Sequence, residues 1–200
     1  MRNESSEAKE RSIMRTRLNF EKPLVFLLVL VASFGWQNVL AAETNAAPQR
    51  IGIYDSRAIA YAHFWSEAHQ REINELVKAA KEARAAGHTE RFKELDAALK
   101  KEQEQNHLQV FSTAPVDDVL AEMKDRLAEI QKEAGVARLV SKWDSKTLKE
   151  HQRAERLDVT DRLLREFNLS EKQMKVAKEI QTKPPLPLDK ARKLTREGKL

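Results

Sequence analysis

Between residues 56 and 134, apolar side chains recur at intervals of three and four positions, and charged side chains fill most of the positions between them. This spacing places the apolar residues on one face of an α-helix. Gly87 ends the first such stretch, and Pro115 breaks the second, because proline cannot donate a backbone hydrogen bond. The pattern predicts a helix over about 56–86 and a second, broken helix that returns to residue 134.

The apolar stripes of these two predicted helices are narrow, and their remaining faces carry many charges. Two helices of this kind have little to bury except against each other. We therefore expect an antiparallel coiled-coil hairpin over 56–134 that projects from the rest of the protein.

Two short segments with strand character flank the predicted hairpin. IGIYD (51–55) precedes it, and VARLVSK (136–142) follows it with β-branched and alternating apolar residues. Because the return arm of the hairpin delivers the second segment to the first, we expect the two to pair. The chain is therefore predicted to be an α+β protein in which a small β-body supports a long helical hairpin.

The C-terminal third predicts further short helices. Residues 157–168 begin with a capping pattern in which Thr160 or Asp158 is the cap. A second capping pattern at 170–173 starts another helix, which the proline-rich segment 183–190 ends. A short charged helix is expected to close the chain.

Composition changes the picture mainly at the N-terminus. Of the 200 residues, 34% are charged, but the run over 24–36 is uncharged and mostly apolar. Basic residues precede this run, and small residues follow it at Val39 and Ala41, an order typical of a secretory signal peptide that is cleaved after Ala41. An uncleaved anchor in the inner membrane, facing the periplasm, is the alternative. A helix of about 13 residues spans only about 20 Å, however, which is short of the ~30 Å hydrocarbon core.

These features divide the chain into four parts. A leader with the signal peptide covers 1–41, and a linker covers 42–49. The α+β domain covers 50–168, and a helical, proline-containing tail covers 169–200. Because the chain has no Cys, and hence no disulfide, we expect a periplasmic protein rather than a small extracellular domain.

Charge is unevenly distributed along the chain. Residues 56–134 hold 12 Lys and Arg against 15 Asp and Glu, whereas residues 135–200 hold 17 against 10. The basic C-terminal third makes an anionic membrane surface a candidate partner. Acidic residues alternate with the basic ones, so a nucleic-acid partner is not expected.

Residues with catalytic or metal-binding potential are few. His63, Glu67 and His69 lie close in sequence, but two histidines at positions i and i+4, the spacing that suits zinc on a helix, are absent. We expect no metal, no cofactor and no catalytic residues. Phe64 and Trp65 are interpreted either as a cover for the junction between body and hairpin or as an aromatic patch that contacts unfolded clients.

Three stretches resemble the Skp/OmpH family of periplasmic chaperones: IGIYDS (51–56), ARLVSKWDSKTL (137–148) and LDVTDRLLREFN (157–168). The order of signal peptide, strand, helical hairpin, strand and capped helix is also similar. The resemblance implies a homotrimer with a shared β-body, whose helical arms hold unfolded outer-membrane proteins without ATP. The body and trimer interface would then contain Ile51, Ile53, Leu139, Val140 and Trp143.

The chain departs from the family pattern in three respects. The predicted hairpin is slightly acidic rather than basic, and residues 144–156 are highly charged where the family has a further strand. The tail from Leu169 also extends past the usual family ending. The alternative function is a non-enzymatic envelope adaptor that binds one fixed partner through its coiled-coil arms and proline-containing tail.

Overall fold

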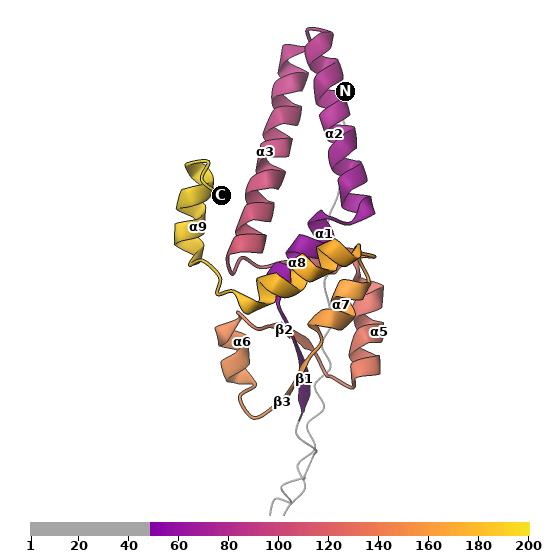
Figure 1. The fold of residues 1–200 in the computed structure, drawn as a ribbon, viewed down its shortest axis with the longest axis vertical. Helices are drawn as coiled ribbons and strands as arrows, with labels where there is room; N and C mark the ends of the chain where they lie inside the picture. The colour runs from indigo at the N-terminus through magenta and orange to yellow at the C-terminus, as the bar shows by residue number, and fades with distance from the viewer. Residues whose placement is uncertain (1–48) are drawn as a thin grey trace, which may run out of the picture. The chain divides into compact units, whose positions relative to one another are not determined.

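Three parallel β-strands form the sheet around which the protein is built (Figure 1). The structure is a computed structural model that describes residues 49–200. β1 (Arg50–Tyr54) lies between β2 (Leu139–Ser141) and β3 (Glu155–Asp158), and both neighbours pair with it in parallel. Both edges of β1 are therefore occupied by strands of the same chain.

The α+β class predicted from the sequence is confirmed, and β1 pairs with the segment expected to be its partner. β2 is shorter than the expected 136–142. β3 was not predicted: residues 157–168 were assigned to one helix, but the observed α7 (Thr160–Arg165) begins only after this strand. The sequence hides β3 because ERLD is a charged edge strand without alternating apolar residues.

Gly52 allows close packing over the middle of the sheet. A Cβ atom at this position would lie 2.8 Å from Cδ2 of Leu139 and 3.1 Å from Cγ2 of Val159. Both distances are shorter than ordinary contacts between carbon atoms. Only glycine therefore lets these two side chains close over β1.

The main core closes around α1 (Ser56–Phe64), which directly follows β1 and is almost completely buried. α1 packs against α3, α7 and α8. α4 (Asp117–Glu122) and α5 (Lys124–Ala134) contribute further side chains to the same core. Its largest fully buried members are Ile59, Val116, Val119, Ile130, Val159, Leu163 and Leu164.

α2 (Glu67–Ala85) and α3 (Thr89–Phe111) lie side by side and are joined by a turn at Gly87. The φ angle of Gly87 is 75°, a value that favours glycine. A small core of their own lies between the two helices, where Ala80, Ala83 and Leu95 are buried. This core is separate from the main one.

The prediction of a single helix over 56–86 is wrong, because the helix is interrupted at Trp65. Ser66 starts α2 by capping it: the Ser66 hydroxyl accepts a hydrogen bond from the backbone N–H of His69. α1 therefore belongs to the body, and α1 and α2 are separate helices that both contact α3.

The returning arm is also shorter than expected. α3 ends at Phe111, and residues 117–134 form α4 and α5 instead of continuing along α2. Val119 and Ile130 show the reason, since both are buried in the main core. These apolar side chains bury more surface against the sheet and α1 than they would in a longer coiled coil, and the larger buried area is more stabilising.

The tail folds back on the rest of the described chain. α8 (Glu171–Thr182) packs against α1, and α9 (Leu188–Arg196) packs against α3. The predicted capping box of Ser170 and Gln173 is present at the start of α8. Between α8 and α9, the backbone N–H of Leu186 donates to the carbonyl oxygen of Phe111 at 2.9 Å. α6 (Ser145–Glu150) connects β2 to β3.

The predicted leader and its cleavage after Ala41 lie outside the described residues. Between residues 49 and 200, no helix combines the length and the apolar character needed to cross a membrane.

Candidate functional site

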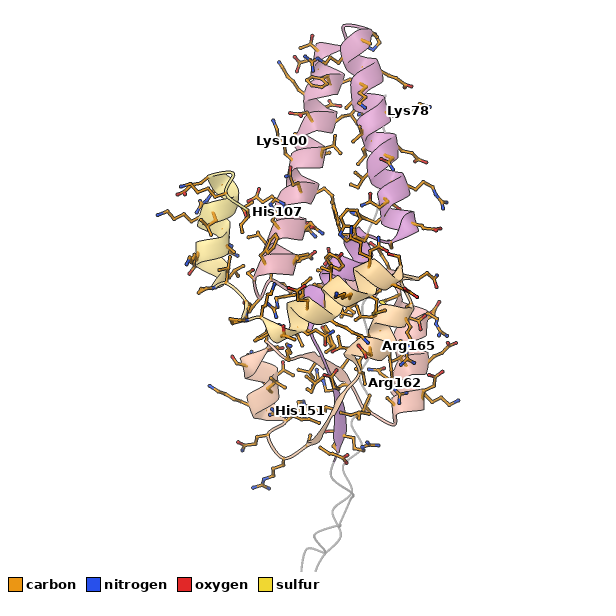
Figure 2. The ribbon with its side chains drawn as sticks, in the orientation of Figure 1. Lys78, Lys100, His107, His151, Arg162 and Arg165 are labelled. Atoms are coloured by element: carbon orange, nitrogen blue, oxygen red, sulfur yellow. The ribbon has the colours of Figure 1, made fainter. Side chains whose placement is uncertain are left out.

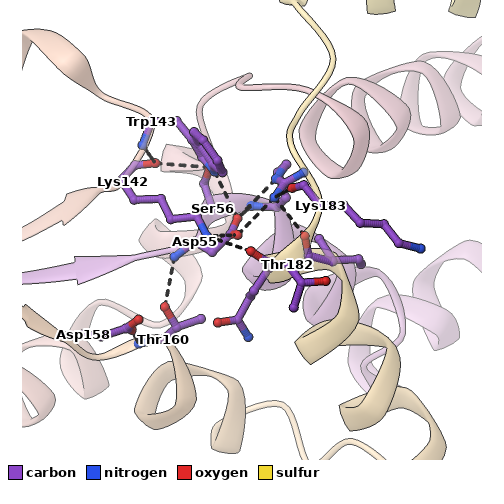
Figure 3. A network of polar contacts seen from close by, with 12 residues as sticks. Asp55, Ser56, Lys142, Trp143, Asp158, Thr160, Thr182 and Lys183 are labelled. Carbon is purple, nitrogen blue, oxygen red and sulfur yellow. Dashed lines mark hydrogen bonds and ion pairs between the residues drawn. The ribbon is translucent and has the colours of Figure 1, made fainter.

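A buried carboxylate lies at the carboxyl end of β1 (Figure 3). Asp55 is fully buried, and it caps α1 by accepting a hydrogen bond from the backbone N–H of Arg57. Its Oδ2 atom lies 2.6 Å from Nζ of Lys142 and 3.3 Å from Nη2 of Arg57. Its Oδ1 atom accepts a hydrogen bond from Nε1 of Trp143 at 3.1 Å. Burial alone would raise the pKa of Asp55, but the hydrogen bonds from Lys142, Trp143 and Arg57 hold it below its ordinary value.

The ends of all three strands meet around this carboxylate. The backbone N–H of Asp55 donates to Oγ1 of Thr160, which follows β3, at 3.0 Å. Ser141, the last residue of β2, donates from Oγ to Oγ of Ser56 at 3.2 Å. Because parallel strands carry their carboxyl ends to one edge of the sheet, residues far apart in sequence converge here.

Arg57 links this edge of the sheet to the tail. Its Nη2 atom donates to the carbonyl oxygens of Ile180 and Lys183, at 2.9 and 2.6 Å. These carbonyls lie at the end of α8, where few helical N–H groups remain to bond them. The guanidinium group also lies over the ring of Trp143, 4.8 Å from its centroid. The contacts of Arg57 therefore hold the tail on the body.

This network, which we call the Asp55 network, favours a structural role over a catalytic one. The Asp55 and Arg57 side chains are 0% and 3% exposed, and both have partners inside the protein. Loss of one partner would leave an uncompensated buried charge, which is strongly unfavourable. The network is therefore expected to control stability and the position of the tail.

A cavity of about 480 Å³ lies beside the Asp55 network, along β2. Its other walls come from the start of α6 and from the segment between α3 and α4. Tyr54 lines the cavity together with Asp117 and Asp144. Burial, with the nearby charges of Asp117 and Asp144, raises the pKa of Tyr54 to about 12. The sequence does not predict this cavity, because its lining comes from segments that only the fold brings together.

A cluster of rings marks the junction of α1 and α2. Phe64 and Trp65 lie edge to face with centroids 5.2 Å apart, and Phe64 lies 5.7 Å from His69. Phe64 is half-buried, whereas Trp65 is 43% exposed. Phe64 thus covers the junction, and Trp65 is presented to solvent.

Two histidines of this cluster face carboxylates. The rings of His63 and His69 are 4.6 Å apart, and Nε2 of His63 lies 3.0 Å from Oε2 of Glu122. Nε2 of His69 is buried without a hydrogen-bond partner, 3.8 Å from Oε1 of Glu102. Burial, reinforced by His63, lowers the pKa of His69. Within residues 49–200, no group of three side chains could hold a metal ion.

A second large apolar side chain is exposed at the end of α3. Phe111 is 43% exposed, and its ring lies 5.9 Å from that of His107. Trp65 and Phe111 are the large apolar side chains exposed in the described part of the chain, and they lie directly before the N-cap of α2 and at the last residue of α3. Phe111 was not among the residues predicted to form a site, although its position at the end of the helical pattern, shortly before Pro115, is a usable signal.

The residues predicted for a trimer interface are already used inside one chain. Ile51 and Val140 are buried, and Ile53, Leu139 and Trp143 are half-buried. Trp143 belongs to the Asp55 network, which the sequence does not predict. The trimer stays a prediction.

Comparisons with known proteins found no relative, so these residues are assigned no role by similarity. No family model, no curated protein and no solved structure matches the chain. The likeness to the Skp/OmpH chaperones therefore stays a hypothesis based on the three sequence stretches that suggested it.

Proposed function

We propose that the protein is an ATP-independent periplasmic holdase that binds unfolded outer-membrane proteins without enzymatic activity. The observation that carries this proposal is the exposure of Trp65 and Phe111 at the body ends of α2 and α3. Exposed aromatic side chains offer a large contact area for apolar side chains of other chains. Unfolded β-barrel proteins supply such side chains at alternate positions.

The charge on α2 and α3 supports this role. Lys78 and Lys100 lie on the outer sides of the pair (Figure 2), and each is within reach of an acidic residue one turn away on its own helix. Such exposed pairs contribute little to stability but keep the helices solvated. The two helices are solvated along their length and carry aromatic side chains at the end nearest the body. They therefore bind clients at that end, and their charged outer faces do not aggregate.

The small core between α2 and α3 also suits a protein that accepts different clients. Its buried members are Ala80, Ala83 and Leu95, of which two are small. Regions with few buried apolar contacts open locally at low free-energy cost. We therefore expect α2 and α3 to adjust to the shape of a bound segment.

The proposal includes a homotrimer in which three α2–α3 pairs project around a shared cavity. β1 already has a partner on each edge, so contacts between copies would use surfaces other than β1. Native mass spectrometry of the purified protein tests this part. A folded monomer that still protects clients would remove the trimer from the proposal and leave the holdase.

The holdase is tested by dilution of several unrelated unfolded β-barrel proteins from urea, with light scattering as the readout. Trp65→Ser combined with Phe111→Ser should lose most of the protection. Ala97→Ser combined with Ala98→Ser alters two exposed positions of α3 and should keep it. Equal protection by the two double variants would remove the aromatic residues from the mechanism. No protection by the unaltered protein would overturn the holdase.

A structural adaptor of the cell envelope is the second candidate, and the ordered tail favours it. Arg57 fixes the end of α8, and Leu186 is bonded to Phe111, so the proline-rich segment has a defined position. A fixed surface suits one native partner better than many unfolded ones. An adaptor would bind one envelope protein tightly and fail with every unfolded client.

A further inference from the structure

The outer edge of β2 carries unpaired backbone groups. The carbonyl of Arg138 and the backbone N–H of Lys142 both bond to β1, at 2.9 and 2.8 Å. In a parallel ladder, alternate residues direct their N–H and C=O groups to opposite sides. Leu139 and Ser141 therefore direct theirs away from β1.

Most of these outward groups have no partner. The carbonyl of Ser141 accepts a hydrogen bond from the backbone N–H of Asp144 at 3.0 Å. The N–H of Ser141, and both the N–H and the C=O of Leu139, form no backbone hydrogen bond with any residue from 49 to 200. Unpaired groups along a strand are a template for a further strand.

These groups border the cavity beside β2. Residues 138–141 line it along the whole strand, and residues 113–117 with 144–147 form its other walls. Its volume of about 480 Å³ is within the range of pockets that bind ligands. The cavity thus has room beside β2 for a short extended segment about as long as β2 itself.

We propose that β2 binds an extended segment of an unfolded polypeptide as an added strand. The site follows from the unpaired groups and the cavity alone. Only the identity of the partner, an unfolded client, rests on the function proposed above.

The end of the cavity near Ser141 selects a basic side chain. Tyr54 is in register with Ser141, and the carboxylates of Asp117 and Asp144 are close enough to Tyr54 to raise its pKa. Neither carboxylate forms an ion pair with the residues that the structure describes, but Asp144 caps α6 by accepting a hydrogen bond from the backbone N–H of Thr147, and Arg138 and Lys146 line the same cavity. A lysine or arginine of the added strand would meet the Asp117 carboxylate and the Tyr54 hydroxyl there, with the Asp144 carboxylate beside them.

The walls around β2 favour a single strand over a second copy of the protein. An extended chain can enter between α6 and the segment before α4. The β2 strand of another copy is flanked by the same two segments, residues 113–117 and 144–147, so a second copy would have to fit four such segments into the seam between the two edges. The other edge of the sheet, β3, has the charged sequence ERLD, which opposes edge-to-edge pairing.

The probe is a fluorescein-labelled peptide of alternating valine and threonine with one central lysine, titrated into the full chain and followed by anisotropy. Leu139→Pro removes an outward N–H of β2 without removing a bond to β1. Arg156→Pro does the same on the outer edge of β3, because the inward N–H groups there include those of Glu155, which bonds to Gln49 just before β1, and of Val159, which bonds to Ile53. We expect Leu139→Pro to weaken binding about tenfold and Arg156→Pro to leave it unchanged.

A second measurement does not depend on how well the variants fold. The same peptide with N-methyl groups on its central residues cannot form the backbone bonds, and it should bind the unaltered protein at least about tenfold more weakly. Amide exchange over 138–142 should slow when the unmodified peptide binds. A glutamate in place of the lysine should weaken binding further.

Equal binding of the methylated and unmethylated peptides would overturn the proposal. So would a dimer that Leu139→Pro dissociates, because the edge of β2 would then belong to a second copy. The Trp65→Ser, Phe111→Ser variant should still bind the peptide. Loss of client protection with retained peptide binding would therefore reject the proposed aromatic site and keep the strand site.

Discussion

The Nη2 atom of Arg57 lies 2.6 Å from the carbonyl oxygen of Lys183, which is 126 positions away in the sequence. The same guanidinium group pairs with the fully buried carboxylate of Asp55. One side chain therefore joins the first turn of α1 and the sheet edge to the tail. The tail beyond Leu169 is a part of the fold and not an appendage to it.

Arg57→Ala should destabilise the protein strongly. It would leave the Asp55 carboxylate buried with fewer partners, a change that costs about 3–5 kcal/mol when a buried pair is broken. Urea denaturation measures the loss. Limited trypsin digestion should also cut the tail within α8, for example after the exposed Lys175, faster than in the unaltered protein. Arg153→Ala removes an exposed arginine and should change neither result.

The pKa of Asp55 predicts a loss of stability in acid. Its pKa is lowered in the folded protein, so the unfolded chain binds this proton more readily. The ionised Asp55 carboxylate stabilises the folded protein fully when the pH is above 3.8, the ordinary pKa of aspartate. This contribution is lost as the pH falls through the lower pKa that Asp55 has in the folded protein. The urea midpoint of the unaltered protein should fall as the pH is lowered from about 5 to about 2. The Asp55→Asn variant should be less stable at neutral pH, but its urea midpoint should change less with pH over this range. If the midpoint of the variant depends on pH as steeply as that of the unaltered protein, Asp55 is not the cause.

His69 predicts a second loss of stability, in mild acid. Its folded pKa lies below the ordinary 6.5, so the unfolded chain again binds the proton more readily. Stability should decline as the pH drops from about 6.5 through the folded pKa of His69. His69→Gln should remove this decline, whereas His88→Gln, at an exposed turn, should keep it. Identical pH profiles for the two variants would contradict the prediction.

Gly52→Ala should destabilise the sheet by about 1–3 kcal/mol, the usual cost of overpacking. The added Cβ would meet Cδ2 of Leu139 at 2.8 Å. Leu139→Ala, which is destabilising by itself, should make Gly52→Ala less costly by removing that atom. A double-mutant cycle measures this coupling, and strictly additive effects would show that the contact is relieved elsewhere.

Features that depend on neighbouring residues were predictable from the sequence. The strand signal of IGIYD, the turn at Gly87 and the capping box of Ser170 and Gln173 all occur where the pattern places them. Each depends on contacts within a few residues, which the local sequence already contains. The break at Trp65 was missed because Ser66 was not recognised as a cap in the middle of a helical pattern.

The candidate sites were less predictable. Phe64 and Trp65 were singled out by their chemistry, but their different exposures follow from packing at the junction of α1 and α2. Phe111 was missed because exposure is not visible in a helical pattern. The Asp55 network and the cavity beside β2 could not be predicted, since their members come from distant segments.

The sequence by itself determined the α+β class, the first strand and several of the helix ends, because periodicity, capping and turn preferences act over a few residues. The tertiary structure decided that β1 is flanked on both sides and that α4 and α5, which were predicted to continue a hairpin, pack in the main core instead. It also decided that the tail is fastened by Arg57. These outcomes depend on which buried surfaces and buried charges meet across the chain, and that competition is resolved only when the whole core closes.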